Sequence, residues 1–344
     1  MPLIEFNWKP NFPEIVKPHN RPVNPRLFEH AHKELKRLLT YMYIESDSPV
    51  ASCLVIAPKA TEPFMRFCGD YAPVVNKWIE TGHYPIPHVL HSLHKIASFK
   101  VFLDFDLANS FHQFRLGELT RRRLSVQTPW GQFEPLFLPE GVPPASGILQ
   151  KCMDNIFGEF QDWAIVIFDN LLVLANDYDD ACNKAELVFA RCKERNLVLK
   201  FSKTWLGFPE VTFFGYVCAY QSYKLSQDRT LKITEMTFPK SLKHMQRFLG
   251  CALYFRNFVE GYATLTARLT DMTRKSFNWA DKSTWQVDYE AEFEKFKGAL
   301  LEAVSLFYPD FTLCWILQFD ASDDGVGCVL YHDVSQIVLD GEGN

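Results

Sequence analysis

Two aspartates lie where the chain could hold divalent metal ions. Asp106 ends a segment, 100–106, whose alternation predicts a strand, and Asp169 lies with Asn170 between the apolar runs of a predicted tight β-hairpin over 164–175. Carboxylates on two non-adjacent strands can converge, and Mg²⁺ takes carboxylate oxygens together with substrate phosphates. A pair of such ions activates a 3′-hydroxyl and stabilises a leaving pyrophosphate. From spacing alone the alternative stays open, because aspartates at strand ends and turns are also common turn formers.

The elements that must position these aspartates form a mixed pattern. Asn24-Pro25 is typical of a helix start, with an N-cap followed by proline, and Asp177 opens a helix that closes at Arg195. Strand and helix runs follow one another without βαβ alternation, which indicates an α+β chain. Further strands are predicted at 53–57, 65–68, 198–200, 212–218, 312–319 and 326–331, and helices at 108–114, 145–159 and from 241 in a largely helical stretch to 305.

Composition excludes several classes of protein. A chain of 344 residues with 22% charged and 15% aromatic residues is neither disordered nor of low complexity. No apolar run approaches the ~18 residues needed to span a bilayer, and the first residues lack the apolar core of a signal peptide. The nine cysteines are scattered without a CxxC pair, which argues against a disulfide framework. The chain is predicted to be intracellular, in cytoplasm or nucleus, with no membrane partner.

Charge is unevenly distributed along the chain. The net charge is −5, but residues 184–247 carry 12 Lys and Arg against 5 Asp and Glu. Such an excess is most often a solvated helix face. It gains a function only if another feature brings a phosphate backbone to it.

About seven motifs in order resemble those of gypsy-type LTR-retrotransposon reverse transcriptases. They cover nearly the whole chain. The first, which resembles the fingers, combines Ser48-Pro49, the run to RFCGDY at 66–71, Asn76-Lys77 and YPIP at 84–87. The others are DLANSFHQFRL at 106–116, LPEGVPPASGILQ at 138–150, IFDNLLVLA at 167–175, VTFFGYV at 211–217, SLKHMQRFLGCALYFRNFV at 241–259 and LQFDASDDGVGCVL at 317–330.

The resemblance implies a fold, a function and domain boundaries. The expected fold is α+β, a right-hand polymerase with fingers, palm and thumb, followed by a helical connection and an incomplete RNase H-like α/β segment. Fingers and palm are expected at 1–235, thumb or connection helices at 236–305, and the RNase H-like fragment at 306–344. The implied activity is RNA-directed DNA polymerisation within a retrotransposon polyprotein. Its partners would be an RNA or DNA template with a primer, deoxynucleoside triphosphates and two Mg²⁺.

The resemblance also implies roles for single residues. Asp106 and Asp169 match the catalytic, metal-binding aspartates. Arg66 and Lys59 would contact the incoming triphosphate, for which a guanidinium fork is well suited. Phe111 matches the aromatic residue that closes on the incoming sugar and excludes a 2′-hydroxyl. Two further matches are Gln150, expected near nucleotide and template, and Lys203, either a proton donor to pyrophosphate or a surface lysine.

Two departures from the family pattern bear on activity. Asn170 stands where the family has a second acidic residue, so one negative charge beside the metals is lost. Asp104, on the same strand face as Asp106, could restore it, although we expect an exposed strand residue there. Of the RNase H carboxylates, Asp320 alone falls within the chain as a vestigial site residue, so RNase H activity is not expected.

Three functions therefore remain open from the sequence. The first is an active polymerase, which the match of Asp106, Asp169, Phe111, Arg66 and Gln150 favours. The second is a decayed, nucleic-acid-binding remnant, and the third is an interaction scaffold that kept only the fold. Asn170 and an altered second motif, with a glutamate and two prolines at 140, 143 and 144, favour decay. The sequence predicts either a fragment of a longer polyprotein or a truncated element copy.

Overall fold

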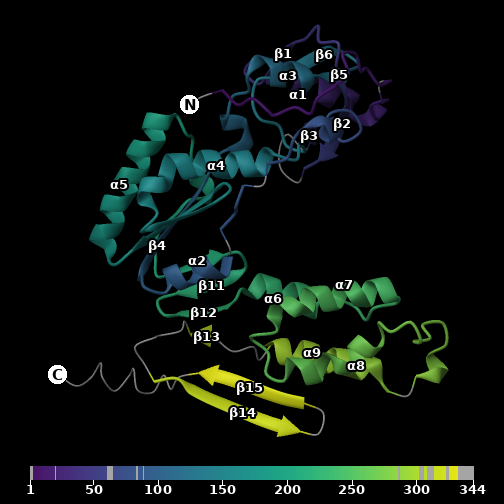
Figure 1. Cartoon of the computed structure of the whole chain (residues 1–344), viewed down its shortest axis with the longest axis vertical. Coiled ribbons are helices and arrows are strands. Elements are labelled where there is room, and N and C mark those ends of the chain that lie inside the picture. The colour runs from purple at the N-terminus through teal and green to yellow at the C-terminus, as the bar shows by residue number, and fades with distance from the viewer. Residues whose placement is uncertain are drawn as a thin grey trace. The chain divides into compact units, whose positions relative to one another are not determined.

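The structure is a computed structural model of the whole chain (Figure 1). It describes residues 3–19, 21–59, 65–82, 84–87, 89–285, 287–301, 306–307, 314–322 and 325–331. The chain divides into two compact units, the first formed by 1–92 with 99–211 and the second by 93–98 with 212–344. The motifs of the resemblance from 66–71 to 167–175 all lie in the first unit. The domain boundaries expected at 235 and 305 stay predictions.

The first unit contains two sheets. One has the strand order β1-β6-β5-β2-β3, antiparallel except for the parallel pair β2–β5, and the other has the antiparallel order β7-β8-β4-β9. The strands are β1 (Tyr43–Glu45), β2 (Ser52–Pro58), β3 (Met65–Asp70), β4 (Val101–Asp106), β5 (Val126–Thr128), β6 (Gly131–Pro135), β7 (Ala164–Ile167), β8 (Asn170–Ala175) and β9 (Trp205–Phe208). The helices are α1 (Phe28–Leu38), α3 (Glu118–Arg123), α4 (Ala145–Phe157) and α5 (Tyr178–Arg195), while α2 (Val89–Ile96) crosses the boundary between the units.

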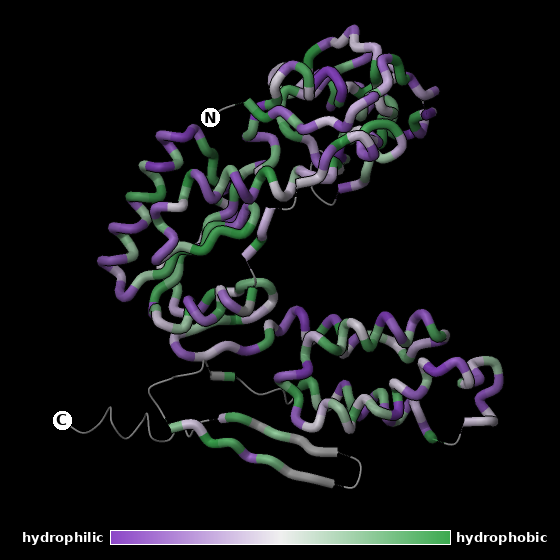
Figure 2. The backbone as a smooth tube through the Cα atoms, viewed as in Figure 1, coloured by the Kyte–Doolittle hydropathy of each residue, from purple (hydrophilic) through white to green (hydrophobic). Residues whose placement is uncertain are grey.

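Helices α4 and α5 cover the sheet that carries both aspartates (Figure 1). Helix α5 begins where the sequence predicts, because the Asp177 carboxylate accepts the Asp180 N–H at the N-cap. Its buried residues, Ala181, Ala185, Val188 and Cys192, face the strands. In Figure 2 the strands beside these helices are largely hydrophobic, and hydrophilic residues recur along α5. The apolar core therefore fixes β4 and β8, which carry the site.

The second unit combines a sheet with a helical cluster. The sheet has the order β10-β11-β12-β13, and a separate antiparallel pair is formed by β14 and β15. Phe248, Phe293 and Phe296 are fully or almost fully buried in the helical core. The elements are β10 (Glu210–Phe213), which crosses the unit boundary, β11 (Tyr216–Ala219), β12 (Ser222–Leu225), α6 (Gln227–Thr234), α7 (Leu242–Ala252), α8 (Tyr262–Asp271), α9 (Tyr289–Leu301), β13 (Leu306–Phe307), β14 (Ile316–Ser322) and β15 (Gly325–Tyr331).

Several local predictions were wrong in detail. The hairpin turns at Phe168 and Asp169 rather than at Asp169 and Asn170, since Ile167 pairs with Asn170. Residues 198–200 form an isolated bridge instead of a strand, and 108–114 contain only a short 3₁₀ helix, Ser110–Gln113. Residues 302–305 and 312–313 of the predicted helix and strand lie outside the described residues.

Candidate active site

Asp106 and Asn170 lie directly opposite each other on neighbouring strands. They are register partners at the end of β4 and the start of β8. The Leu107 N–H donates to the Asp169 carbonyl at 3.2 Å, which makes Asp106–Asn170 a non-hydrogen-bonded antiparallel pair. In such a pair the Cα atoms are about 4.5 Å apart and both side chains stand on one face of the sheet. The backbone of Asp169, in the turn, is therefore adjacent to the end of β4.

The Asp106 carboxylate has a basic partner. Lys203 Nζ lies 3.1 Å from Asp106 Oδ2, and the carboxylate is 18% exposed while the lysine is 58% exposed. The Lys200 N–H donates to the Asp106 carbonyl at 2.7 Å and so brings the 3₁₀ helix Phe201–Lys203 to the strand end. The sequence left two roles open for Lys203, a proton donor or a surface lysine. The structure adds a third, because Lys203 is the counter-ion of Asp106.

Asp104 is not the exposed strand residue that we expected. It is half-buried, between β8 and β9, with Leu172 and Trp205 as its register partners. Burial, together with the nearby charge of Asp106, raises the pKa of Asp104 to about 6. Its position two residues before Asp106 places it on the same face of β4. Asp104 therefore adds no negative charge to the site only where the pH lies below about 6.

The donor set suits a hard divalent cation. The backbone brings together three residues with oxygen-bearing side chains, the carboxylates of Asp106 and Asp169 and the amide of Asn170, and oxygen donors of this kind are those that Mg²⁺ prefers. Within the described part of the chain, no group of three or more His, Cys, Asp or Glu residues is placed to hold a metal ion. The residues present fit Mg²⁺ provided that waters or substrate phosphates complete its coordination shell.

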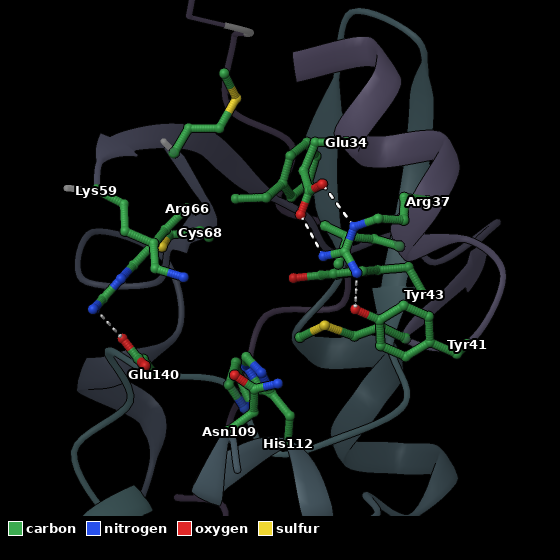
Figure 3. Close-up of a pocket in the computed structure, with 16 residues that line it drawn as sticks. Glu34, Arg37, Tyr41, Tyr43, Lys59, Arg66, Cys68, Asn109, His112 and Glu140 are labelled. Carbon is green, nitrogen blue, oxygen red and sulfur yellow. Dashed lines mark hydrogen bonds and ion pairs between the residues drawn. The ribbon is translucent and has the colours of Figure 1, made fainter. Parts of the chain in front are cut away.

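A second group of predicted residues lines a cavity of about 180 Å³ in the first unit (Figure 3). Lys59, at the end of β2, and Arg66, on β3, lie together on one wall, and His112 lies on another. Arg66 Nη1 contacts Glu140 Oε2 at 3.2 Å, an ion pair in which both side chains are about half exposed. Burial lowers the pKa of His112, against the opposing effect of the Glu140 carboxylate.

Two of the remaining predicted residues lie wholly or partly in the interior of the first unit, and the side chain of the third is outside the described residues. Phe111 is half-buried and packs on the first unit's core. Gln150 has no exposed surface, and both its amide atoms are hydrogen-bonded within the protein, so a direct nucleotide contact would require it to leave those partners. Asp320 is in β14, opposite Gly327, and its side chain lies outside the described residues.

Sequence reasoning missed the ion pairs between residues far apart in the chain. Neither the Glu140 ion pair with Arg66 nor the Lys203 ion pair with Asp106 leaves a local pattern, because 74 and 97 residues separate the partners. The only signal for Glu140 was that an acidic residue replaces the aromatic one usual in the second motif.

The chain matches two family models and several curated proteins. Residues 66–218 match "Reverse transcriptase (RNA-dependent DNA polymerase)", and residues 285–338 match "RNase H-like domain found in reverse transcriptase". The chain is 27% identical over 312 residues to the Tf2-7 and Tf2-3 transposon polyproteins of Schizosaccharomyces pombe. These alignments cover 90% of this chain but 23% of each polyprotein, so the chain spans about a quarter of their length.

Solved structures share the fold. The foamy viral protease-reverse transcriptase in complex with dsDNA superposes with a TM-score of 0.83 at 20% identity, over 96% of this chain and 68% of that one. The same viral protein in complex with an RNA/DNA hybrid gives 0.74 at 19% identity, over 97% and 46%. The fold is thus the α+β fold of reverse transcriptases. Residues 66–218 are thus similar to the reverse transcriptases of LTR retrotransposons, and residues 285–338 to the RNase H-like domain found with them.

No helix within the described ranges is both long and apolar enough to cross a membrane.

Proposed function

We propose that this chain is an RNA-directed DNA polymerase that extends a primer 3′-hydroxyl with deoxynucleoside triphosphates, using two Mg²⁺ ions. The single observation that carries the proposal is the convergence of Asp106, Asn170 and Asp169 at one end of the β4–β8 pair. Bound Mg²⁺ would supply charge neutralisation for the attacking and leaving oxygens. Asp106, Asp169 and the Asn170 amide are the residues that would hold it.

The protein's own side chains would divide the remaining tasks. Arg66 and Lys59, on one wall of the cavity, would bind the triphosphate through charge-assisted hydrogen bonds. Phe111 would pack against the incoming sugar and exclude a 2′-hydroxyl. Lys203, held near Asp106 in this structure, is placed to donate a proton once its carboxylate partner is engaged elsewhere.

A primer–template duplex is the proposed macromolecular partner. Residues 184–247 carry seven more positive than negative charges, which suits phosphate contacts that position a duplex without reading its sequence. The viral structures with this fold were solved with dsDNA and with an RNA/DNA hybrid, which supports the same class of partner here. We place this activity inside the cell, in cytoplasm or nucleus.

The competing proposal is a decayed polymerase that binds duplex without catalysis. Asn170 favours it, because the residue nearest Asp106 across the sheet carries no charge. Primer extension on an RNA template with Mg²⁺ separates the two proposals, with Asp106→Asn as the inactive control and duplex binding measured in parallel. Extension by the wild-type chain that Asp106→Asn abolishes supports the polymerase. Equal, background extension by both proteins with intact duplex binding supports the remnant.

A further inference from the structure

The buried amide of Gln150 bonds to β7 and to the first residue of the turn that carries Asp169. Its Nε2 donates to the Val166 carbonyl in β7 at 2.9 Å, and its Oε1 accepts the Phe168 N–H in the turn at 2.8 Å. Gln150 is on α4 and is fully buried, so water does not compete for these bonds. One side chain thus connects the helix to the residue immediately before Asp169.

The turn needs such support because its backbone is strained. Phe168 has a φ of +56°, in the left-handed region that bulky residues rarely adopt. A non-glycine residue in this conformation costs on the order of 1–3 kcal/mol and persists only where the surroundings impose it. The hydrogen bond from Phe168 N–H to Gln150 is one such restraint, and it fixes the peptide unit between Ile167 and Phe168, at the entry to the turn.

Gln150 is in turn held by two residues outside the hairpin. Its Nε2 also donates to Asp154 Oδ1, one turn further along α4, at 2.9 Å. The other oxygen, Asp154 Oδ2, accepts the hydroxyl of Tyr84 at 2.8 Å. This hydrogen bond raises the pKa of Tyr84. The contacts form a continuous chain from Tyr84 through Asp154 and Gln150 to Phe168.

Tyr84 is fitted closely against α4. A Cβ added at Gly147 would lie 3.3 Å from the Tyr84 Cβ, tighter than most real contacts of this kind. The absence of a side chain at 147 therefore lets the tyrosine lie along the helix, with its hydroxyl two turns further on at Asp154. Because Tyr84 approaches α4 at one point and bonds to it at another, its hydroxyl has a defined position.

We propose that Tyr84, Asp154 and Gln150 are positioning residues that fix the Phe168–Asp169 turn. They would set where the Asp169 carboxylate stands relative to Asp106 without touching substrate themselves. The consequence for catalysis rests on the proposed function, since it needs Asp169 to act at the metal site. The chain of hydrogen bonds from Tyr84 to Phe168 does not depend on the proposed function.

The experiment compares wild type with Tyr84→Phe, which removes one hydroxyl and leaves the ring packed. Amide hydrogen exchange followed by mass spectrometry reports the segment 164–175, which contains the Phe168 N–H. We expect exchange in this segment to rise about tenfold, equivalent to ~1.4 kcal/mol, close to the lower limit for a hydrogen bond to a charged group. Tyr178→Phe, which alters an exposed tyrosine at the start of α5, is the matched control and should change nothing there. Unchanged exchange in Tyr84→Phe overturns the proposal.

A double-mutant cycle tests whether the link runs through Gln150. In a Gln150→Ala background, Tyr84→Phe should add no further increase in exchange, because the chain of bonds is already broken. Additive effects would mean that Tyr84 acts by another route and would overturn the proposal. If Gln150→Ala does not fold, Asp154→Asn takes its place, since it keeps the shape of the side chain and removes its charge.

Kinetics then distinguish this proposal from the proposed function. If the wild-type chain polymerises, Tyr84→Phe should lower kcat several-fold and raise the Mg²⁺ concentration for half-maximal rate, with the KM for nucleotide and the duplex Kd unchanged. A raised duplex Kd with constant kcat would contradict a positioning role. If the wild-type chain is inert, the proposed function fails, while the exchange measurement still decides whether these residues hold the turn.

Discussion

Asp106 faces the amide of Asn170 across a non-hydrogen-bonded pair of antiparallel strands. This is the closest cross-strand relationship available to two side chains in a sheet. The position at which the family has a second acidic residue is therefore in direct reach of the first aspartate. The missing charge therefore lies at the proposed metal site and not on a peripheral surface.

Asn170→Asp should raise polymerisation and lower the Mg²⁺ concentration needed for half-maximal rate by about tenfold. Two unit charges 4 Å apart interact with about 4 kcal/mol at an effective dielectric near 20. A part of this attraction between the new carboxylate and the metal is therefore enough for a tenfold change in the Mg²⁺ requirement. Without metal the same substitution should lower the free energy of unfolding slightly, because like charges then face each other. Titration of initial rates with Mg²⁺, and urea unfolding in chelator, measure the two effects. Asn155→Asp adds the same charge on an exposed part of α4 and is the control. An unaltered rate and metal requirement would make Asn170 an accepted variant of the hairpin.

Lys203→Met should lower the half-saturating Mg²⁺ concentration two- to fivefold, because the lysine no longer competes with the cation for Asp106. The size follows from the ~0.2–1 kcal/mol typical of an exposed ion pair. If Lys203 also donates a proton to pyrophosphate, the maximal rate falls at the same time. Lys282→Met, which breaks a comparable exposed pair with Glu290, serves as the control in the same titration. A higher Mg²⁺ requirement in Lys203→Met would refute the competition.

Glu140→Gln should lower the KM for deoxynucleoside triphosphates two- to fivefold. The carboxylate pairs with Arg66 in the cavity where the triphosphate is proposed to bind, so its removal frees the guanidinium and reduces repulsion of phosphate. Steady-state kinetics with the nucleotide as variable substrate provide the measurement. Glu159→Gln, which removes the carboxylate paired with Arg191, should leave the KM as it is. A constant KM in Glu140→Gln would contradict the proposal that Arg66 binds the nucleotide.

His112 should make the fold less stable as the pH falls below about 6.5. Burial lowers the pKa of this imidazole, so the unfolded chain binds a proton more readily than the folded chain does. The contribution to stability is present above the ordinary histidine pKa and is lost as the pH falls through the lowered value. His112→Gln should give a shallower dependence of unfolding free energy on pH between 5 and 7, measured by urea denaturation. His30→Gln, at an exposed position, should retain the wild-type slope, and an equal slope in all three proteins would contradict the assignment.

Phe111→Ala should admit ribonucleotides, raising their kcat/KM relative to deoxynucleotides by about tenfold or more. The aromatic ring is proposed to occupy the space that a 2′-hydroxyl would need, and a clash worth ~1.4 kcal/mol already gives a factor of ten. The ratio of the two kcat/KM values on one template is the measurement. Because Phe111 also packs on the core, thermal unfolding of the variant must be followed alongside. Unaltered sugar selectivity in a folded variant would leave Phe111 a core residue.

The sequence by itself determined most local structure and both metal-binding candidates. Helix α5 starts at the Asp177 cap and the hairpin lies between two apolar runs, because caps and alternation involve residues a few positions apart. The α+β class followed from the run of strand and helix patterns, whereas the polymerase fold was implied by the resemblance of the motifs. Such features are encoded by neighbours, so a linear chain is enough to read them.

Tertiary structure decided the contacts that tune the site. The register that sets Asn170 opposite Asp106, the Lys203 and Glu140 ion pairs, and the burial of Asp104 and Gln150 all join segments far apart in the chain. Strand register and ion pairing at such separations depend on how the core packs α4 and α5 on the sheet, and one residue of slip would turn every side chain to the other face. No periodicity in the sequence carries that information, which is why the carboxylates could be found beforehand and their partners could not.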